Sequence, residues 1–461
     1  MDLSKYTPEI VKNLQKLIRI KTVLDTPVEG GPFGQGNKEC LEETLKICEE
    51  LGFKVTNLDG YCGYAEVGEG EELVGIIGHL DVVPEGEGWK YPPYSGEIVD
   101  GELWGRGTWD DKGPTIISIY AIKALMDSGF KFNKRVRLIF GCNEETGSLC
   151  MKHYLEVDEP ITYGVSPDAS FPVIFAEKTI NNIELKGTSS QEGTVKLISL
   201  DAGIVINAVP DKCEFKLSYG CEHCKQDTID KLDKYFNENN IKYEYKDENG
   251  ALSYVVHGKA AHGSIPHLGV NAASFAIVGL SNVLNNSFVG FYSKYINTCV
   301  HGEKLGCYAE DEYGPVAVNI GLVNYENNSF SIKINSRLPF NTTSEKMIAQ
   351  IKETIKDTNV EAILHSSSEG FIIDKESTMI KSLVKAYQEV TKDYKSEPIC
   401  TAGGTYARAF NNCVAFGPEM EGYGEIIIHQ PNERIQIRAI EDIMKIYFKA
   451  YADLIEKVSF K

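Results

Sequence analysis

Histidine and acidic residues occur in five short polar motifs spread along the chain. Two histidines and three carboxylates from such motifs form a ligand mixture that zinc, cobalt or manganese accepts. Two ions that share one carboxylate can together hold a water molecule and polarise a carbonyl group. The residue types therefore predict a two-metal hydrolase centre. The motifs are HLD at 79–81, GRGTWDDK at 105–112, NEETG at 143–147, SPD at 166–168 and HQPNE at 429–433.

The first and third motifs follow apolar runs that read as strands. His79 and Asp81 come after LVGII, and residues two apart on a strand point to the same side. We therefore expect the Asp81 carboxylate to reach the second imidazole nitrogen of His79 and to fix its tautomer. Glu144 and Glu145 follow VRLIFGC and point in different directions, so that one can bind metal while the other acts as a general base.

Each of these motifs also has a simpler interpretation when it is taken alone. A single HxD pair fits ordinary polar residues at a strand end, and most adjacent glutamates belong to a solvated loop. Asp168 lies in a turn beside Pro167, where aspartate is common. Only the order of the motifs and their sequence context favour the catalytic interpretation.

Composition limits the class of protein. A chain of 461 residues with 42% hydrophobic and 25% charged residues is expected to form two globular domains. The net charge of -19 repels phosphate backbones and anionic lipids, so we expect neither nucleic-acid nor membrane partners. The first residues lack the features of a secretory signal, and no apolar run approaches the roughly 18 residues of a spanning helix. We therefore expect a cytoplasmic protein.

The twelve cysteines show no compact repeating framework, which favours reduced and mostly buried thiols. Cys221 and Cys224 flank Glu222 and His223, and Cys213 lies nearby in the sequence. These residues could hold a structural metal. A single CxxC without a second matching pair is a weak signal, however, and unligated thiols are the preferred interpretation.

Apolar periodicity predicts an α/β domain at the start of the chain. Strand-like runs alternate with helical patterns, which is typical of a mostly parallel sheet, and the polar motifs follow the strands, where such sheets place their ligand sites. The last part of the chain shows the same character. Helices are expected at 7–19, 37–51, 115–127, from 377 and at 440–458, and strands at 73–77, 136–140, 414–416 and 425–429.

The middle of the chain differs, because glycine-punctuated strands dominate after about residue 176, with helical stretches at 225–238 and 271–284. This pattern predicts an inserted α+β domain over 178–376, for which the family resemblance described below implies the role of a lid. The α/β domain is then discontinuous and comprises 1–177 and 377–461, and the resemblance implies that it is the catalytic domain. Two strand-helix-strand halves in the insertion, at about 180–255 and 256–375, hint at a duplication, although no sequence repeat is clear.

The ordered motifs resemble the M20 metallopeptidase family, whose hallmarks are HxDxVP, GRGxxDxK, EExG, PDxxFPV and a late HxxNE. This chain has HLDVVP, GRGTWDDK, EETG, PDASFPV and HQPNE, so the resemblance covers essentially its whole length. The segments AHGSIPHLGVNA and TAGGTYAR and the length of the insertion are most similar to the dipeptidase V branch, the PepV-like Xaa-His dipeptidases.

The resemblance implies a role for each site residue. Asp110 would bridge two divalent ions, of which zinc is favoured and manganese or cobalt are alternatives. Glu144 would be the general base, supported by Asp81. The neighbouring Asp111 leaves the identity of the bridge open, and an unusual peptide bond there would re-aim Asp111. The implied metal ligands are His79, Asp110, Glu145, Asp168 and His429.

Further residues resemble the substrate contacts of the family. His262 in the insertion would stabilise the developing oxyanion. Arg337 would grip a terminal carboxylate in a bidentate fork, with Asn207 as another lid contact. Gly403, Gly404 and Thr405 would present backbone groups to the same substrate end. The simpler alternatives are a surface-loop histidine, a strand-surface cation and a tight turn.

These features predict a metal-dependent dipeptidase that acts on small peptides. An arginine clamp and a lid favour short substrates with a free C-terminus, and the long insertion favours a monomer, because such members use its second half where others use a partner subunit. An amidohydrolase that removes an acyl group from an amino acid is the main alternative. A catalytically silent binding protein is disfavoured, because all five ligands and the base are present.

Overall fold

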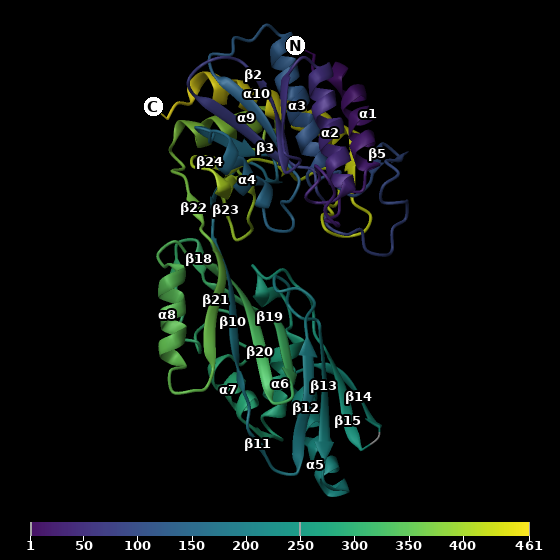
Figure 1. Cartoon of the computed structure of the whole chain (residues 1–461), viewed down its shortest axis with the longest axis vertical. Coiled ribbons are helices and arrows are strands. Elements are labelled where there is room, and N and C mark those ends of the chain that lie inside the picture. The colour runs from purple at the N-terminus through teal and green to yellow at the C-terminus, as the bar shows by residue number, and fades with distance from the viewer. Residues whose placement is uncertain (1, 249, 461) are drawn as a thin grey trace. The chain divides into compact units, whose positions relative to one another are not determined.

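The computed structural model describes residues 2–248 and 250–460 and divides into two compact units (Figure 1). Unit 1 comprises Met1–Glu177 and Phe371–Lys461, and unit 2 comprises Lys178–Gly370. The chain re-enters unit 1 earlier than the expected residue 377. The reason is that β22 (Phe371–Ile372) pairs with β9 (Ile174–Glu177) and so extends the sheet of unit 1.

Unit 1 is an α/β structure around one nine-stranded sheet. Its central strands β6, β3, β7 and β24 are parallel neighbours, and antiparallel strands lie toward the edges. Every residue of β3 is buried, as expected of a strand covered on both faces. In spatial order the strands are β1 (Lys54–Leu58), β2 (Cys62–Val67), β6 (Arg135–Gly141), β3 (Leu73–His79), β7 (Tyr163–Ser166), β24 (Cys413–Ala415), β9 and β22, with β23 (Ile399–Thr401) also paired to β9.

Helices pack against this sheet and against one another. The predicted helices near 7–19, 37–51, 115–127, from 377 and at 440–458 are confirmed, with small shifts at their ends. α3 is buried along most of its length because it contacts α1, α10 and β3. The helices are α1 (Thr7–Ile18), α2 (Gln35–Glu50), α3 (Lys112–Asp127), α4 (Leu149–Val157), α9 (Thr378–Thr391) and α10 (Ile437–Lys457).

The expected strand at 425–429 is wrong. This segment forms a loop between β25 (Pro418–Glu419) and β26 (Arg434–Gln436). Gly422 and Gly424 have φ values of 95° and 85°, and His429 itself has a φ of 58°. Because these left-handed conformations turn the backbone, the apolar residues here cannot continue as an extended strand.

Unit 2 contains one antiparallel eight-stranded sheet with helices α5 (Glu222–Glu238), α6 (Ala272–Leu280), α7 (Ser287–Tyr295) and α8 (Ser344–Thr354). The two expected halves, which meet near residue 255, do not form separate parts of this sheet. β10 comes first in the sequence but lies between β20 and β21. In spatial order the strands are β14 (Lys242–Glu248), β15 (Ala251–His257), β13 (Lys212–Tyr219), β12 (Val195–Ala202), β19 (Ala317–Glu326), β20 (Ser329–Leu338), β10 (Thr179–Thr188) and β21 (Glu361–Ser368).

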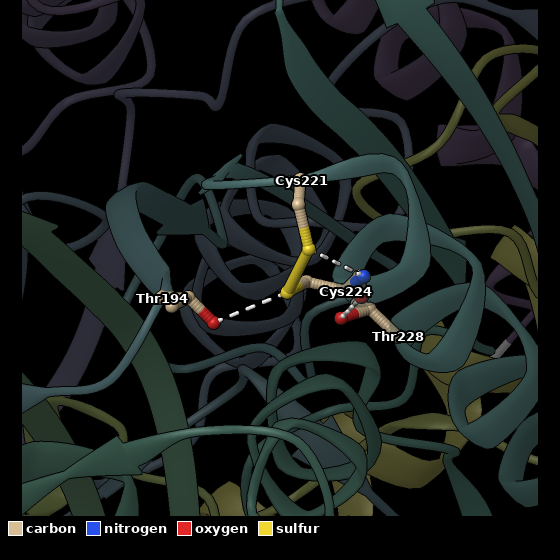
Figure 2. Close-up of a disulfide and its surroundings, with 4 residues drawn as sticks. All are labelled: Thr194, Cys221, Cys224 and Thr228. Atoms are coloured by element: carbon tan, nitrogen blue, oxygen red, sulfur yellow. Dashed lines mark hydrogen bonds between the residues drawn. A yellow bond between two sulfur atoms is a disulfide. The ribbon is translucent and has the colours of Figure 1, made fainter.

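Two cysteines of unit 2 differ from the expectation of reduced thiols. Cys221 and Cys224 form a disulfide at the start of α5 (Figure 2). Their positions explain the pairing, because Cys221 is the N-cap of the helix and Cys224 lies in its first turn, with 5.3 Å between their Cα atoms. The other ten cysteines form no disulfide, as expected.

Among the described residues, no helix has both the length and the apolar character needed to cross a membrane.

Gly78 allows a close approach of β3 and α3 beside the candidate site. A Cβ atom at this position would lie 2.8 Å from Asp111 Oδ2 and would overlap the Thr115 hydroxyl. Both neighbours are themselves buried, so neither has room to move away. The packing of helix on strand therefore requires glycine at this position.

We predict that Gly78→Ala lowers the free energy of unfolding of unit 1 by about 1–3 kcal/mol, because the added methyl group overpacks a buried contact. Urea denaturation followed by tryptophan fluorescence measures this, since Trp89, Trp104 and Trp109 all lie in unit 1. Gly290→Ala is the control, because Gly290 is exposed in α7 with open space around it. Since α7 belongs to unit 2, which holds no tryptophan, far-UV circular dichroism follows the unfolding of both variants alongside the fluorescence. An unchanged unfolding midpoint in Gly78→Ala would contradict the packing argument.

Candidate metal centre

The candidate site lies at the carboxyl ends of the parallel strands of unit 1. His79 is the last residue of β3 and pairs with Gly141 at the end of β6. Glu144 and Glu145 follow β6, and Asp168 follows β7, the other neighbour of β3. Parallel strands end at the same edge of a sheet, so these side chains come together there.

Asp110 lies between the two histidines predicted to share the site. Its Oδ1 atom is 2.9 Å from His79 Nε2, and its Oδ2 atom is 2.8 Å from His429 Nε2. His79 is almost fully buried, whereas the His429 side chain is half exposed. One carboxylate thus faces ring nitrogens from residues far apart in the sequence.

The remaining predicted ligands complete two groups around Asp110. His429 Nε2 lies 3.1 Å from Glu145 Oε1, and His79 Nε2 lies 3.8 Å from Asp168 Oδ2. Potential ligand atoms within 4.8 Å of one another form the triplets His79, Glu144, Asp168 and His79, Asp110, Glu145. The structure therefore brings together all five predicted ligands and the predicted base.

The contacts of Asp81 differ in part from the expectation. Its carboxylate lies 3.5 Å from His79 Nδ1, but the closer partner of Nδ1, at 2.9 Å, is the backbone carbonyl of Asp81. β3 ends at His79, so Asp81 is not on the strand as assumed. The two Asp81 carboxylate oxygens instead accept hydrogen bonds from the Glu144 and Glu145 amides at 2.9 and 3.1 Å. Asp81 thereby orients both the imidazole and the glutamate pair.

Asp111 points away from the histidine rings. The peptide bond between Asp110 and Asp111 is cis, as expected from the resemblance. The Oδ2 atom of Asp111 accepts hydrogen bonds from the His79 backbone amide at 3.0 Å and from the Thr115 hydroxyl at 3.1 Å. Of the two neighbouring aspartates, Asp110 is therefore the one that faces both ring nitrogens.

Burial and like charges dominate the electrostatics of the site. Burial together with the charge of Asp110 raises the pKa of Asp168 to about 7. Burial and neighbouring carboxylates also raise the pKa of Glu144 and of Glu145. For His429 burial acts in the opposite direction, but hydrogen bonds to Asp110 and Glu145 raise its pKa to about 11.

These shifts have a common cause, which is an excess of carboxylates in a desolvated space. Such a cluster is stabilised by bound positive charge, either protons or metal cations. Its imidazole nitrogens and carboxylate oxygens are the donor atoms of divalent transition-metal sites. The residues present therefore fit divalent cations.

Glu433 holds the segments that carry Asp110 and His429 together. Its side chain is fully buried, and Oε2 accepts from Arg106 Nη1 at 2.9 Å and from the Gly107 amide at 3.0 Å. The Oε1 atom accepts from the Trp109 amide at 2.9 Å. Next to it, β26 pairs with β5 (Glu102–Trp104). Glu433 belongs to the HQPNE motif, but no role was predicted for it from the sequence.

Glu177 holds the loop that contains the predicted Gly403, Gly404 and Thr405 contacts. This buried carboxylate accepts from the Thr405 hydroxyl at 2.7 Å and from Arg408 Nε at 3.0 Å. The Thr405 amide also donates to Glu177, at 3.3 Å. Thr405 therefore uses its amide and hydroxyl to anchor the loop. Neither Glu177 nor Arg408 was singled out from the sequence.

In unit 2, the predicted residues His262 and Asn207 lie on adjoining segments. The Gly263 amide donates to the Asn207 carbonyl at 2.7 Å, and the exposed His262 contacts Ser264 Oγ through Nδ1 at 2.6 Å. Asn319 on β19, which sequence reasoning missed, supports the Asn207 segment. Its amide nitrogen donates to the carbonyls on both sides of Asn207, at 2.9 and 3.0 Å.

Arg337 lies on β20 and is only 4% exposed, so it is not the strand-surface cation of the simpler interpretation. Its Nε atom donates to Asn335 Oδ1 at 3.2 Å. Asn335 is the register partner of Asn319, so Arg337 lies near the same part of the unit 2 sheet as the support of the Asn207 segment. A buried guanidinium held by a neighbouring amide is well oriented for bidentate binding.

The protein-family model described as peptidase family M20/M25/M40 matches residues 75–457 of this chain, and this range includes every motif of the site. The chain belongs to this peptidase family. As a member of the family it is a hydrolase, and its α/β unit with an inserted second unit has the fold class expected from the sequence.

Relatives and solved structures agree with this membership. A Staphylococcus haemolyticus protein named "Putative dipeptidase" is 33% identical over 464 residues, covering 98% of each chain. A Staphylococcus aureus protein with the same description is 34% identical over 464 residues, again covering 98% of each chain. The crystal structure of human carnosine dipeptidase 1 gives a TM-score of 0.56 at 15% identity, covering 98% of this chain and 97% of that one. At such identity the structural likeness shows the fold alone.

We predict that Glu433→Gln lowers the free energy of unfolding of this M20 peptidase by about 3–5 kcal/mol, because it leaves the charge of the buried Arg106 unpaired. The matched control is Glu102→Gln, whose partner Arg434 forms a partly exposed ion pair at 3.1 Å. That pair should contribute at most about 1 kcal/mol. Urea denaturation monitored by tryptophan fluorescence compares the two variants, and equal losses would refute the role given to Glu433.

Proposed function

We propose that this M20 peptidase is a dipeptidase whose centre holds two divalent cations. Asp110 would bridge them, with His79 and Asp168 at one ion and Glu145 and His429 at the other. The observation that carries the proposal is the position of Asp110, whose two oxygens face His79 and His429 separately at 2.9 and 2.8 Å. A carboxylate that presents one oxygen to each of two donor groups suits a bridging ligand.

The donor set favours zinc, with manganese or cobalt as alternatives. Two imidazoles and three carboxylates suit borderline divalent ions, and metal availability decides among them. When bound, such ions polarise the substrate carbonyl and make a water molecule more acidic. Zinc is favoured because imidazole ligands bind it readily in hydrolytic sites.

Glu144 is the proposed general base. It would take a proton from the attacking water and pass that proton to the leaving amine, which balances the hydrolysis of one peptide bond. Burial and the neighbouring Asp168 charge raise the pKa of Glu144, which suits a group that must gain and then lose a proton. The hydrogen bonds from the Glu144 and Glu145 amides to Asp81 fix the backbone of both residues.

We propose that unit 2 acts as the lid of the enzyme. His262 would stabilise the developing oxyanion, and its contact with Ser264 limits the orientations of its ring. Arg337 would bind the substrate carboxylate, with Asn207 as a further contact. The backbone groups of Gly403 and Gly404 would contact the same end of the substrate, on a loop anchored by Glu177.

Three features support dipeptides as substrates. The two full-length relatives carry the description of dipeptidases, and the buried Arg337 suits a free carboxylate close to the scissile bond. The chain also carries a net charge of -19, which disfavours polyanionic partners.

We further propose a cytoplasmic monomer, because the long insertion supplies within one chain what dimeric members take from a partner. Light scattering of the full chain tests the monomer.

We predict that Glu144→Gln lowers kcat for dipeptide hydrolysis by about 100- to 10,000-fold, because the amide cannot accept the proton of water. The variant should retain both metal ions, as measured by elemental analysis after gel filtration. Glu145→Gln is the matched control on the adjacent residue. It should lower metal content, because a proposed ligand is lost.

The measurements of kcat and of metal content distinguish the proposed role of Glu144 as base from the proposed role of Glu145 as ligand. Unchanged turnover in Glu144→Gln would refute Glu144 as the base. Unchanged metal content in Glu145→Gln would refute Glu145 as a ligand.

We predict that a substrate panel will show higher kcat/KM for dipeptides than for N-acyl amino acids with the same C-terminal residue. The reason is that the proposed lid contacts favour a short peptide with a free carboxylate, whereas the metal chemistry alone would serve any amide. Higher kcat/KM for the N-acyl amino acids would replace the dipeptidase proposal with an amino acid deacylase. Hydrolysis is followed by release of the free amino acid in both arms.

A further inference from the structure

The disulfide between Cys221 and Cys224 (Figure 2) lies at the start of α5 in unit 2. Cys221 and the two intervening residues are exposed, and Cys224 is partly exposed. The bond closes a loop of only two intervening residues, so it constrains little of the unfolded chain. The solvent exposure of this disulfide therefore says more about its role than its small effect on the free energy of unfolding.

The other cysteines are poorly placed to react. Among the ten cysteines outside the disulfide, eight are buried, and burial raises the pKa of each of these eight thiols. A thiol reacts as its thiolate, so these groups are weak nucleophiles in the folded protein. They are Cys40, Cys48, Cys62, Cys142, Cys150, Cys213, Cys307 and Cys413. The sulfur atoms that are at least partly exposed are therefore those of the CxxC segment and of Cys299 and Cys400, and only the CxxC segment forms a disulfide.

Each sulfur of the pair has its own hydrogen-bond donor. The Cys224 backbone amide donates to Cys221 Sγ at 3.2 Å, as part of the N-cap of α5. The hydroxyl of Thr194 donates to Cys224 Sγ at 3.4 Å. Both donors stabilise negative charge on sulfur, and the N-terminus of the 17-residue helix α5 adds its partial positive charge at Cys221.

We propose that Cys221 and Cys224 form a reversible thiol–disulfide exchange site for low-molecular-weight thiols. A thiolate of the small molecule attacks the exposed Cys221 Sγ, the bond to Cys224 breaks, and Cys224 leaves as a thiolate that accepts the Thr194 hydrogen bond. A second small thiolate attacks the mixed disulfide at the sulfur of the small molecule. Cys221 then leaves as a thiolate facing the Cys224 amide.

The exchange is balanced in atoms and electrons. Two small thiols are oxidised to one disulfide, the protein disulfide is reduced by two electrons, and the two thiolates take up the two protons released. The reverse reaction uses a small-molecule disulfide as the oxidant. This site is independent of the proposed metal chemistry, because none of its residues belongs to the candidate centre.

The test uses the full-length folded protein in buffers of reduced and oxidised glutathione. Free thiols are trapped with a maleimide and located by peptide mass spectrometry. We expect the peptide that contains Cys221 and Cys224 to carry two labels in the reducing buffer and none in the oxidising buffer. Labelling of the buried cysteines should not change between the buffers. Two labels in both buffers, or none in either, would overturn the proposal.

Two threonine variants test the proposed leaving-group contact. Thr194→Val removes the donor to Cys224 Sγ and should slow reduction by glutathione about fivefold. Thr228→Val is the matched control, because the Thr228 hydroxyl donates to the Cys224 backbone carbonyl at 2.8 Å and not to its sulfur. Equal reduction rates in the two variants would refute the role of Thr194 in the exchange.

Discussion

The structure of unit 1 depends on one constraint, which is that several carboxylates must share a buried space with two histidines. Asp110 satisfies the ring nitrogens of His79 and His429 at once, and this arrangement needs residues from opposite ends of the sequence. Desolvation raises the pKa of the surrounding acids, so the site is favourable only when positive charge enters it. The chemistry proposed for the enzyme uses this excess of negative charge.

A second set of buried ionic contacts keeps that arrangement in place. Glu433 pairs with Arg106 and accepts hydrogen bonds from backbone amides of the segment that carries Asp110. Glu177 pairs with Arg408, which donates a hydrogen bond to the Gly403 carbonyl and so holds that loop. Neither carboxylate touches the histidine rings. Each fixes a segment without regular structure, where backbone position would otherwise vary. The sheet supplies the edge, and these buried acids position the loops that extend beyond it.

Both chemistries proposed for unit 2 belong to segments that adjoin its antiparallel sheet. The segments of Asn207 and His262 adjoin each other and are supported by Asn319, whereas the disulfide lies at the start of α5. The proposed lid contacts concern the substrate of the peptidase. The cysteine pair concerns the redox state of its surroundings. The proposed substrate contacts and the proposed thiol exchange thus lie on separate elements of unit 2.

Several structural elements could be predicted because they depend on local patterns. Apolar spacing predicted helices at 7–19 and 440–458 and a strand at 73–77, and the structure has them at 7–18, 437–457 and 73–79. The apolar residues after Gly424 misled the same reasoning, because left-handed backbone at His429 turns that segment into a loop. The first predicted half of the insertion, 180–255, includes most of β10. In the structure β10 pairs with β20 and β21, which both belong to the second predicted half.

Residue types, apolar patterns and motif order were enough to indicate the α/β class, the peptidase family and the residues that the structure brings together at the candidate metal centre. Donor chemistry is a property of the side chains themselves, so it can be read without coordinates. Which of two adjacent aspartates faces the histidines, what Asp81 binds and how Glu433 and Glu177 act were decided only by the tertiary structure. These answers depend on burial and on distances between segments hundreds of residues apart, and no local pattern encodes them.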